Sequence, residues 1–120
     1  MKDTTDSLSA VTNVGADEPV HVRSEAHLQD LIRESHVLLV DFYADWCGPC
    51  KMLKPIVERL AAETDATVAK VDIDRLQNLA EANNVQGVPT MFLYVDGELR
   101  EQLVGLREES TLREFVTDHT

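Results

Sequence analysis

The chain has 120 residues with a formal net charge of -11, and 43% of its residues are apolar but only 5% aromatic. This length fits one domain with a single, mainly aliphatic core. No apolar run approaches the ~18 residues of a membrane-spanning helix. No cluster of Lys and Arg offers the phosphate neutralisation that nucleic-acid binding requires. The composition therefore argues against a membrane protein and a nucleic-acid-binding protein.

The N-terminal segment, residues 1–18, is polar and acidic and shows no apolar period. We expect a mobile, disordered tail there. Its start lacks the basic and apolar parts of a secretory signal, which favours a cytoplasmic location. The acid excess of the whole chain indicates either an ordinary solvated surface or adaptation to high salt. We hypothesise salt adaptation, because Arg outnumbers Lys among the 11 basic residues.

The first predicted elements are a strand at 19–22 and a helix that follows Ser24. Serine is a favourable N-cap, and apolar residues recur at helical spacing up to about Ser35. The next run, HVLLVDFYA at 36–44, is almost continuously apolar. Such a run is typical of a central strand buried on both faces.

A second helix is predicted from Cys47 to about Glu63. Pro49 fits its first turn, whereas Pro55 lies inside the pattern and should bend the helix. Five apolar residues at helical spacing are expected to face the core: Met52, Leu53, Ile56, Val57 and Leu60.

The remaining pattern predicts a strand, a short helix, two strands joined by a turn, and a last helix. These lie at 67–73, 76–84, 90–95 and 98–105, with the turn at Asp96-Gly97 and the last helix after Ser110. Alternating strands and helices need parallel neighbours, and the final hairpin adds antiparallel strands. We therefore predict an α/β domain with a central mixed sheet flanked by helices.

The only two cysteines, Cys47 and Cys50, lie within one WCGPC segment directly after a predicted strand. A zinc site needs four ligands, whereas this pair supplies two and the histidines are scattered. A structural disulfide across so short a loop would restrict the unfolded chain very little. A reversible dithiol/disulfide couple is the favoured interpretation. It needs no metal and no cofactor, because the dithiol itself carries the electrons.

The predicted helix start gives the two thiols different roles. Cys47 lies at the N-terminus, where free N–H groups and the helix dipole stabilise a thiolate. Cys50 lies one turn further along and should be more covered. We therefore predict that Cys47 is the nucleophile and Cys50 the resolving thiol.

Asp41 lies in the middle of an apolar strand, where a carboxylate needs a partner or a task. One interpretation is a buried general base with a raised pKa. The other is a strand-end residue that reaches solvent or caps a neighbouring helix.

The segment VDFYADWCGPCKMLKP, residues 40–55, resembles the active-site segment of the thioredoxin family. The segments GVPT at 87–90 and DGELREQLVG at 96–105 match later segments of that family in the same order. The resemblance covers residues 19–120 and implies a thioredoxin fold, with residues 1–18 outside the domain. Tyr43 departs conservatively from the family, since many thioredoxins have Trp at this position.

The resemblance implies a protein disulfide reductase that works by thiol–disulfide exchange and is recycled by a thioredoxin reductase. It implies that Asp41 accepts the proton of Cys50 and that Lys70 moderates the pKa of Asp41, although a strand lysine usually extends to water. It also implies a cis Val88-Pro89 bond packed against the disulfide; an ordinary proline at a strand start is the alternative.

A flat, uncharged patch around Cys47 is expected to bind extended segments of substrate proteins. Its expected members are Trp46, Gly48, Pro49, Val88, Pro89, Val104 and Gly105. Partial burial of Trp46 and a strand bend at Gly105 are the alternatives for those two residues.

Two rival functions stay open for this fold. A thiol oxidase or isomerase is disfavoured because no histidine stands between the cysteines at Gly48-Pro49. A non-catalytic scaffold is disfavoured because both cysteines and Asp41 are present. We expect a monomer that binds disulfide-containing proteins, and neither nucleic acid nor membranes.

Overall fold

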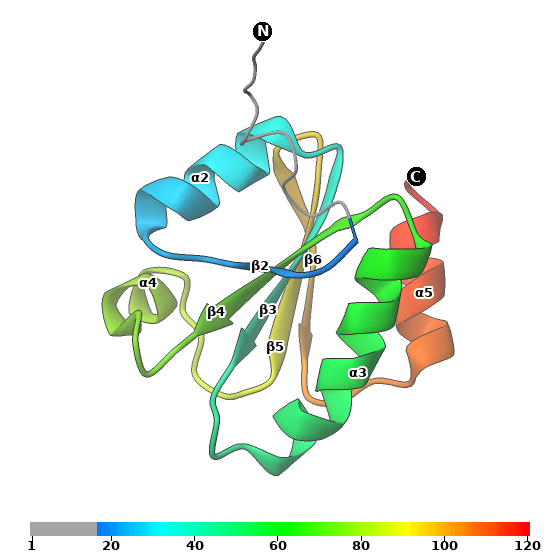
Figure 1. The fold of residues 1–120 in the computed structure, drawn as a ribbon. Coiled ribbons are helices and arrows are strands. Elements are labelled where there is room, and N and C mark those ends of the chain that lie inside the picture. Colours follow the sequence, from blue (N-terminus) through cyan, green and yellow to red (C-terminus); the bar gives the residue numbers. More distant parts are fainter. Residues whose placement is uncertain (1–16) are drawn as a thin grey trace, which may run out of the picture.

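The computed structural model describes residues 17–120, so the tail predicted at 1–18 lies almost entirely outside the described part. The described chain folds in the predicted order of strands and helices (Figure 1). The strands are β2 (Val20–His21), β3 (Val37–Tyr43), β4 (Thr67–Asp72), β5 (Thr90–Val95) and β6 (Glu98–Val104). The helices are α2 (Glu25–Glu34), α3 (Gly48–Glu63), α4 (Gln77–Ala82) and α5 (Glu109–Thr117).

The five strands form one mixed sheet in the order β2-β4-β3-β5-β6. β4 pairs in parallel with both β2 and β3, whereas β5 pairs antiparallel with β3 and β6. The β5–β6 turn places Asp96 and Gly97 at positive φ, 53° and 87°. Two positive φ angles are what a tight two-residue hairpin turn requires, so the predicted hairpin is confirmed.

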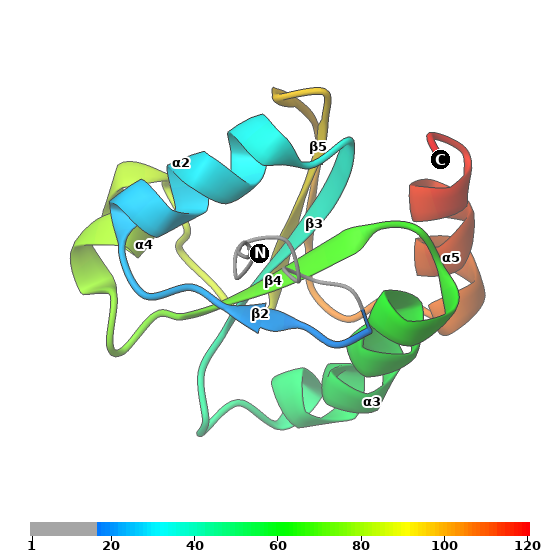
Figure 2. The ribbon, with the colours of Figure 1, turned by 45° about the horizontal axis from the view of Figure 1, so that its top comes forward.

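Helices cover both faces of the sheet: α2 and α4 lie on one side, and α3 and α5 on the other (Figures 1 and 2). Side chains of β3 alternate between these layers. Leu38, Val40 and Phe42 pack in the α2/α4 cluster. Val37 and Leu39 pack in the α3/α5 cluster. By the same alternation Asp41 points to the layer of α3, the helix that carries the cysteines.

Local signals explain where two helices begin. The Ser24 side chain accepts a hydrogen bond from the His27 N–H at 3.1 Å, which confirms it as the N-cap of α2. α3 has Cys47 at its N-cap and Pro49 in its first turn. Pro55 lies inside α3, which continues to Glu63; a bend there stays a prediction.

Two expectations about helices were wrong. Met52 was expected to face the core but is 62% exposed, whereas Leu53, Val57 and Leu60 are fully buried. Those three residues already form the inward row of α3, which leaves Met52 at its edge. α5 begins at Glu109 and not after Ser110. Its buried residues are Leu112 and Val116, and Phe115 packs partly against the same cluster.

None of the helices formed by residues 17–120 is both long enough and apolar enough to span a membrane.

Candidate functional site

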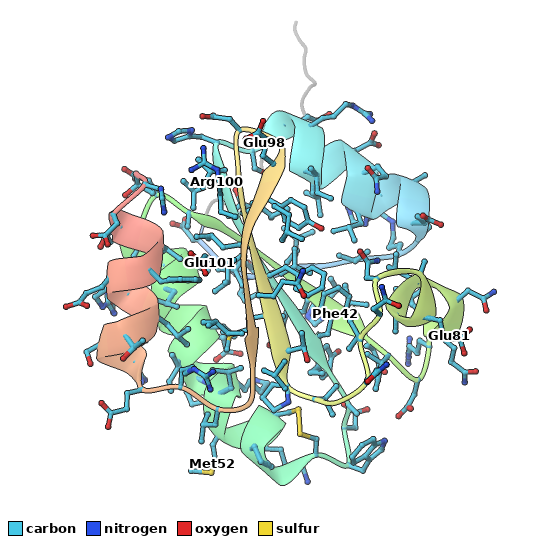
Figure 3. All side chains as sticks on the ribbon, turned by 180° about the vertical axis from the view of Figure 1, so that it is seen from behind. Phe42, Met52, Glu81, Glu98, Arg100 and Glu101 are labelled. Carbon is cyan, nitrogen blue, oxygen red and sulfur yellow. A yellow bond between two sulfur atoms is a disulfide. The ribbon has the colours of Figure 1, made fainter. Side chains whose placement is uncertain are left out.

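The N-terminus of α3 holds the two cysteines at one end of the molecule, Cys47 as N-cap and Cys50 in the first turn (Figure 3). Cys47 and Cys50 form a disulfide, and their Cα atoms are 5.2 Å apart. The Cys47 N–H donates to the Ala44 carbonyl at 3.2 Å, and the Cys47 carbonyl accepts from Lys51 N–H at 3.2 Å. The first turn of α3 therefore fixes both sulfurs within bonding distance of each other.

The sulfur of Cys47 lies at the N-terminus of α3, as predicted. The Cys50 N–H donates to Cys47 Sγ at 3.1 Å. In the reduced state this N–H and the helix dipole stabilise negative charge on Cys47. The expected difference in coverage was wrong at the level of whole residues, because Cys47 is 4% exposed and Cys50 5%. Both cysteines are packed in one cluster with Ala44, against which Ile73 and Val88 from other segments also pack. The electrostatic environment and not burial therefore distinguishes them.

Asp41 is buried in the central strand of the sheet and is 1% exposed. It pairs with Lys70 of β4 on one side and Met91 of β5 on the other. Among the described residues its Oδ1 has no hydrogen-bond partner. Burial raises the pKa of Asp41 to about 6, and the nearby charge of Lys70 partly opposes that increase. The alternative of a solvent-exposed or helix-capping aspartate is therefore wrong.

Lys70 is also buried, at 6% exposed, and does not extend freely to water. Its Nζ lies 4.0 Å from Asp41 Oδ2 and 4.3 Å from the centre of the Tyr43 ring. A carboxylate and an aromatic face are both favourable neighbours for a buried ammonium group. Lys70 and Cys50 line one cleft of about 160 Å³. Lys70, the charged neighbour of Asp41, therefore borders the same cleft as Cys50.

The Val88-Pro89 bond is cis, as the family resemblance implied. Val88 packs against the cluster that contains Cys47 and Cys50. The Pro89 carbonyl accepts a hydrogen bond from the Gly105 N–H at 2.8 Å. Gly105 has a φ of 96°, a left-handed conformation that favours glycine. This bond ties the end of β6 to the loop beside the disulfide.

The expected docking patch contains exposed apolar side chains at this end of the molecule. Trp46 is 67% and Val104 64% exposed, so the partly buried alternative for Trp46 is wrong. The indole N–H of Trp46 donates to Asp74 at 3.0 Å. Gly48 and Pro49 are exposed, Val88 and Gly105 are half-buried, and Pro89 is buried.

Two contributors to this surface were not predicted from the sequence. Met52 lies at the disulfide end of the molecule (Figure 3) and adds exposed apolar area. In the sequence Met52 lies off the helical row formed by Leu53, Val57 and Leu60. This offset could have predicted that Met52 faces solvent. Asp74 orients Trp46 from a different loop, and no sequence pattern links these two residues.

In the part of the chain that the structure describes, no three His, Cys, Asp or Glu residues are grouped so that they could hold a metal ion.

The chain is similar to known proteins over most of its length. A family model described as thioredoxin matches residues 18–118. A thioredoxin of Chlamydia trachomatis is 44% identical over 101 residues, which cover 83% of this chain and 98% of that protein. A bifunctional thioredoxin reductase/thioredoxin of Mycobacterium leprae is 35% identical over 119 residues, covering 97% of this chain and 26% of that protein. A solved structure of a mutant thioredoxin from Halobacterium salinarum is 50% identical with a TM-score of 0.84, covering 88% of this chain and 93% of that one.

Proposed function

The chain belongs to the thioredoxin family and is a thiol–disulfide oxidoreductase, and from this premise we propose how its own residues reduce a protein disulfide. One arrangement carries the proposal: Cys47 lies at the N-terminus of α3 and Cys50 one turn later. Asp41 is buried in β3, and its side chain points to the face of the sheet that α3 covers.

In the first step the Cys47 thiolate attacks one sulfur of the substrate disulfide. The substrate S–S bond breaks, a mixed disulfide forms at Cys47, and the released substrate thiolate takes a proton from water. The N–H of Cys50, which lies 3.1 Å from Cys47 Sγ, supports this assignment because it favours a charged sulfur at Cys47.

In the second step Cys50 attacks Cys47 Sγ and forms the Cys47–Cys50 disulfide. The second substrate thiolate leaves, and two electrons have then passed to the substrate. Cys50 must lose its proton first, and Asp41 is the proposed acceptor. Its raised pKa, about 6, makes it a more competent base near neutral pH than an ordinary aspartate.

Lys70 is proposed to moderate this base. A positive charge 4.0 Å from Asp41 Oδ2 favours the carboxylate, and therefore keeps the pKa of Asp41 from rising further on burial. Without Lys70, Asp41 would be protonated over more of the neutral range and could accept a proton less often.

The partners follow from the same chemistry. Substrate proteins with an accessible disulfide would dock on the patch formed by Trp46, Gly48, Pro49, Val88, Pro89, Val104 and Gly105. A thioredoxin reductase is proposed to return the two electrons. The Mycobacterium leprae relative, named a bifunctional thioredoxin reductase/thioredoxin, supports this pairing. We further propose that the protein acts as a monomer in the cytoplasm, without nucleic-acid or membrane partners.

The domain boundary is part of the proposal. The family match covers residues 18–118, which supports a reductase domain with nearly the proposed start, 19–120, and leaves the preceding tail outside it. Removal of residues 1–18 should therefore leave disulfide reduction intact.

The direct test of the function is reduction of the interchain disulfides of insulin by the full chain, with dithiothreitol as electron donor. The unaltered chain should accelerate the reaction well above dithiothreitol alone. Cys47→Ser should lose that acceleration, and Arg33→Gln in α2, which keeps both cysteines, serves as control. Activity that survives Cys47→Ser would contradict the proposal.

A further inference from the structure

The lysines of the described residues share one location beside the redox pair. Residues 17–120 contain three lysines, Lys51, Lys54 and Lys70, and all three line the 160 Å³ cleft to which Cys50 also contributes. His21 lines the same cleft, and Asp45 is its one acidic lining residue. No arginine lines it. In a chain of net charge -11, this lysine cleft is a local cluster of lysines next to Cys50, in which Lys70 pairs with Asp41 and Lys54 with Glu58.

Lys51 and Lys54 continue a row of α3 that begins at Cys47. The Lys51 N–H donates to the Cys47 carbonyl, so Lys51 lies one helical turn from Cys47, and Lys54 lies three residues further on. At 1.5 Å per residue, the two lysines stand about 6 and 10 Å from Cys47 along the helix axis. An extended peptide spans these distances in about two to three residues.

The charges available to a partner are those of Lys51 and Lys54. Lys70 is buried against Asp41 and the Tyr43 ring. Lys54 holds Glu58 at 2.7 Å, in a pair whose side chains are 61% and 47% exposed. Such an exposed pair contributes little stability, so a partner carboxylate can replace Glu58. Lys51 is exposed, and within residues 17–120 no carboxylate lies within 4.0 Å of its ammonium group.

We propose that the lysine cleft binds acidic side chains of substrate proteins, and that it favours disulfides with Asp or Glu two to four residues from the attacked cysteine. The inference rests on the proposed disulfide reductase function. Charge complementarity selects this occupant, because carboxylates are the side chains that exposed ammonium groups attract. The net charge of the whole molecule would instead favour basic segments, and the experiment separates these two effects.

The test uses three peptides of equal length, each with one internal disulfide and with Glu, Gln or Lys two to four residues from a cysteine. Lys51→Gln/Lys54→Gln is compared with Arg33→Gln/Arg100→Gln, which changes the net charge equally. Arg33 precedes β3, whereas Cys47 follows its end. Arg100 lies far from the disulfide (Figure 3). kcat/KM is measured for each peptide at low ionic strength and in ~1 M salt.

For each variant, kcat/KM for the Glu peptide is divided by kcat/KM for the Gln peptide. This Glu-to-Gln ratio should be about three- to tenfold lower in the lysine variant than in the arginine variant at low salt. The Lys-to-Gln ratio should change in the opposite direction, and both differences should vanish in high salt. A change in the reactivity of the cysteines would alter kcat/KM for all three peptides by the same factor, so it cancels in these ratios. Equal ratios in the two variants, or a Glu-to-Gln ratio that is higher in the lysine variant, would overturn the inference alone. Failure of the unaltered chain to reduce the Gln peptide would overturn the proposed function and this inference together.

Discussion

Asp41 shows most clearly how one residue links the sequence to the chemistry. Its apolar neighbours in β3 predicted burial, and the structure confirms that it is 1% exposed. Burial without a hydrogen bond to Oδ1 stabilises the neutral carboxyl relative to the charged form. The same environment that makes Asp41 a better proton acceptor therefore makes the folded state less stable at neutral pH.

Asp41→Asn should stabilise the protein at pH 7. The pKa of Asp41 is about 6 in the folded state and ordinary in the unfolded chain, so stability falls as pH rises from about 4 to about 6. The substitution removes this loss of about 3 kcal/mol. Urea unfolding across pH 3 to 8 measures it, with Asp65→Asn at an exposed position as control. The gain should disappear below pH 4, and a gain that is independent of pH would contradict the assignment.

The same substitution should slow the release of substrate. Without the Asp41 carboxylate, Cys50 must lose its proton to water, and the mixed disulfide at Cys47 should persist roughly ten- to hundredfold longer at pH 7. Stopped-flow decay of a mixed disulfide with a fluorescent peptide measures this lifetime. An unchanged lifetime between pH 6 and 8 would remove Asp41 from the mechanism.

The two cysteines should behave differently when each is replaced. Cys50→Ser should accumulate a mixed disulfide between Cys47 and a substrate protein, because the resolving thiol is missing. Cys47→Ser should accumulate none under the same conditions. Mass spectrometry of the trapped species gives the result, and equal trapping by both variants would show that the N-terminus of α3 does not select the nucleophile.

Residues whose partner lies on another element could not be placed from the sequence. The position of Lys70 in a strand allowed either a free or a buried ammonium group. Only the β3–β4 register, which pairs Lys70 with Asp41, decides between them. The contact between Trp46 and Asp74 depends in the same way on two loops meeting in space.

At the scale of elements, α3 and α5 are joined by a network of ion pairs on the surface. Arg59 contacts Glu109 at 2.6 Å, and Arg113 contacts both Glu109 at 2.9 Å and Glu63 at 2.8 Å. These two arginines hold the pKa of Glu109 down to about 2. The network includes Glu109, which precedes Ser110, the residue after which the helix was predicted to start. That start could not be read from the sequence, because the partners of Glu109 include a residue 50 positions away.

Glu109→Gln should lower the thermal midpoint at pH 7 by more than Glu114→Gln, an exposed position on the same helix. Because the pKa of Glu109 is lowered, its stabilisation is present above about pH 4.5 and is lost as pH falls through about 2. Thermal unfolding at pH 7 and near pH 2 tests this dependence. Equal midpoints for the two variants at pH 7 would show that the network contributes no stability.

The whole molecule has an arrangement that the alternating order of strands and helices largely predicted. The mixed sheet, the flanking helices and the hairpin are confirmed because they depend on local periodicity and turn residues. The distribution of charge was less predictable. The chain has 22 acidic and 11 basic residues. Lys51 and Lys54 follow Cys50 in the sequence, but only the fold brings Lys70 to the same cleft.

Salt should stabilise this molecule. Acidic residues outnumber basic ones two to one, so screening of their repulsion should outweigh the weakening of surface ion pairs. The thermal midpoint should rise by roughly 5 °C or more between 0.1 and 2 M KCl. Scanning calorimetry at pH 7 measures the change. A midpoint that stays constant or falls would contradict the hypothesis of salt adaptation.

The equilibrium reduction potential of the Cys47/Cys50 couple tests the central claim most directly. It can be measured by equilibration with glutathione or dithiothreitol buffers at pH 7, followed by alkylation of free thiols. The cytosolic glutathione pool lies at about -220 to -260 mV by biochemical extraction. A disulfide reductase needs a two-electron potential at or below this range, and we expect such a value here. A potential well above that range would indicate a thiol oxidase or isomerase, and the absence of a reversible couple would contradict the redox function itself.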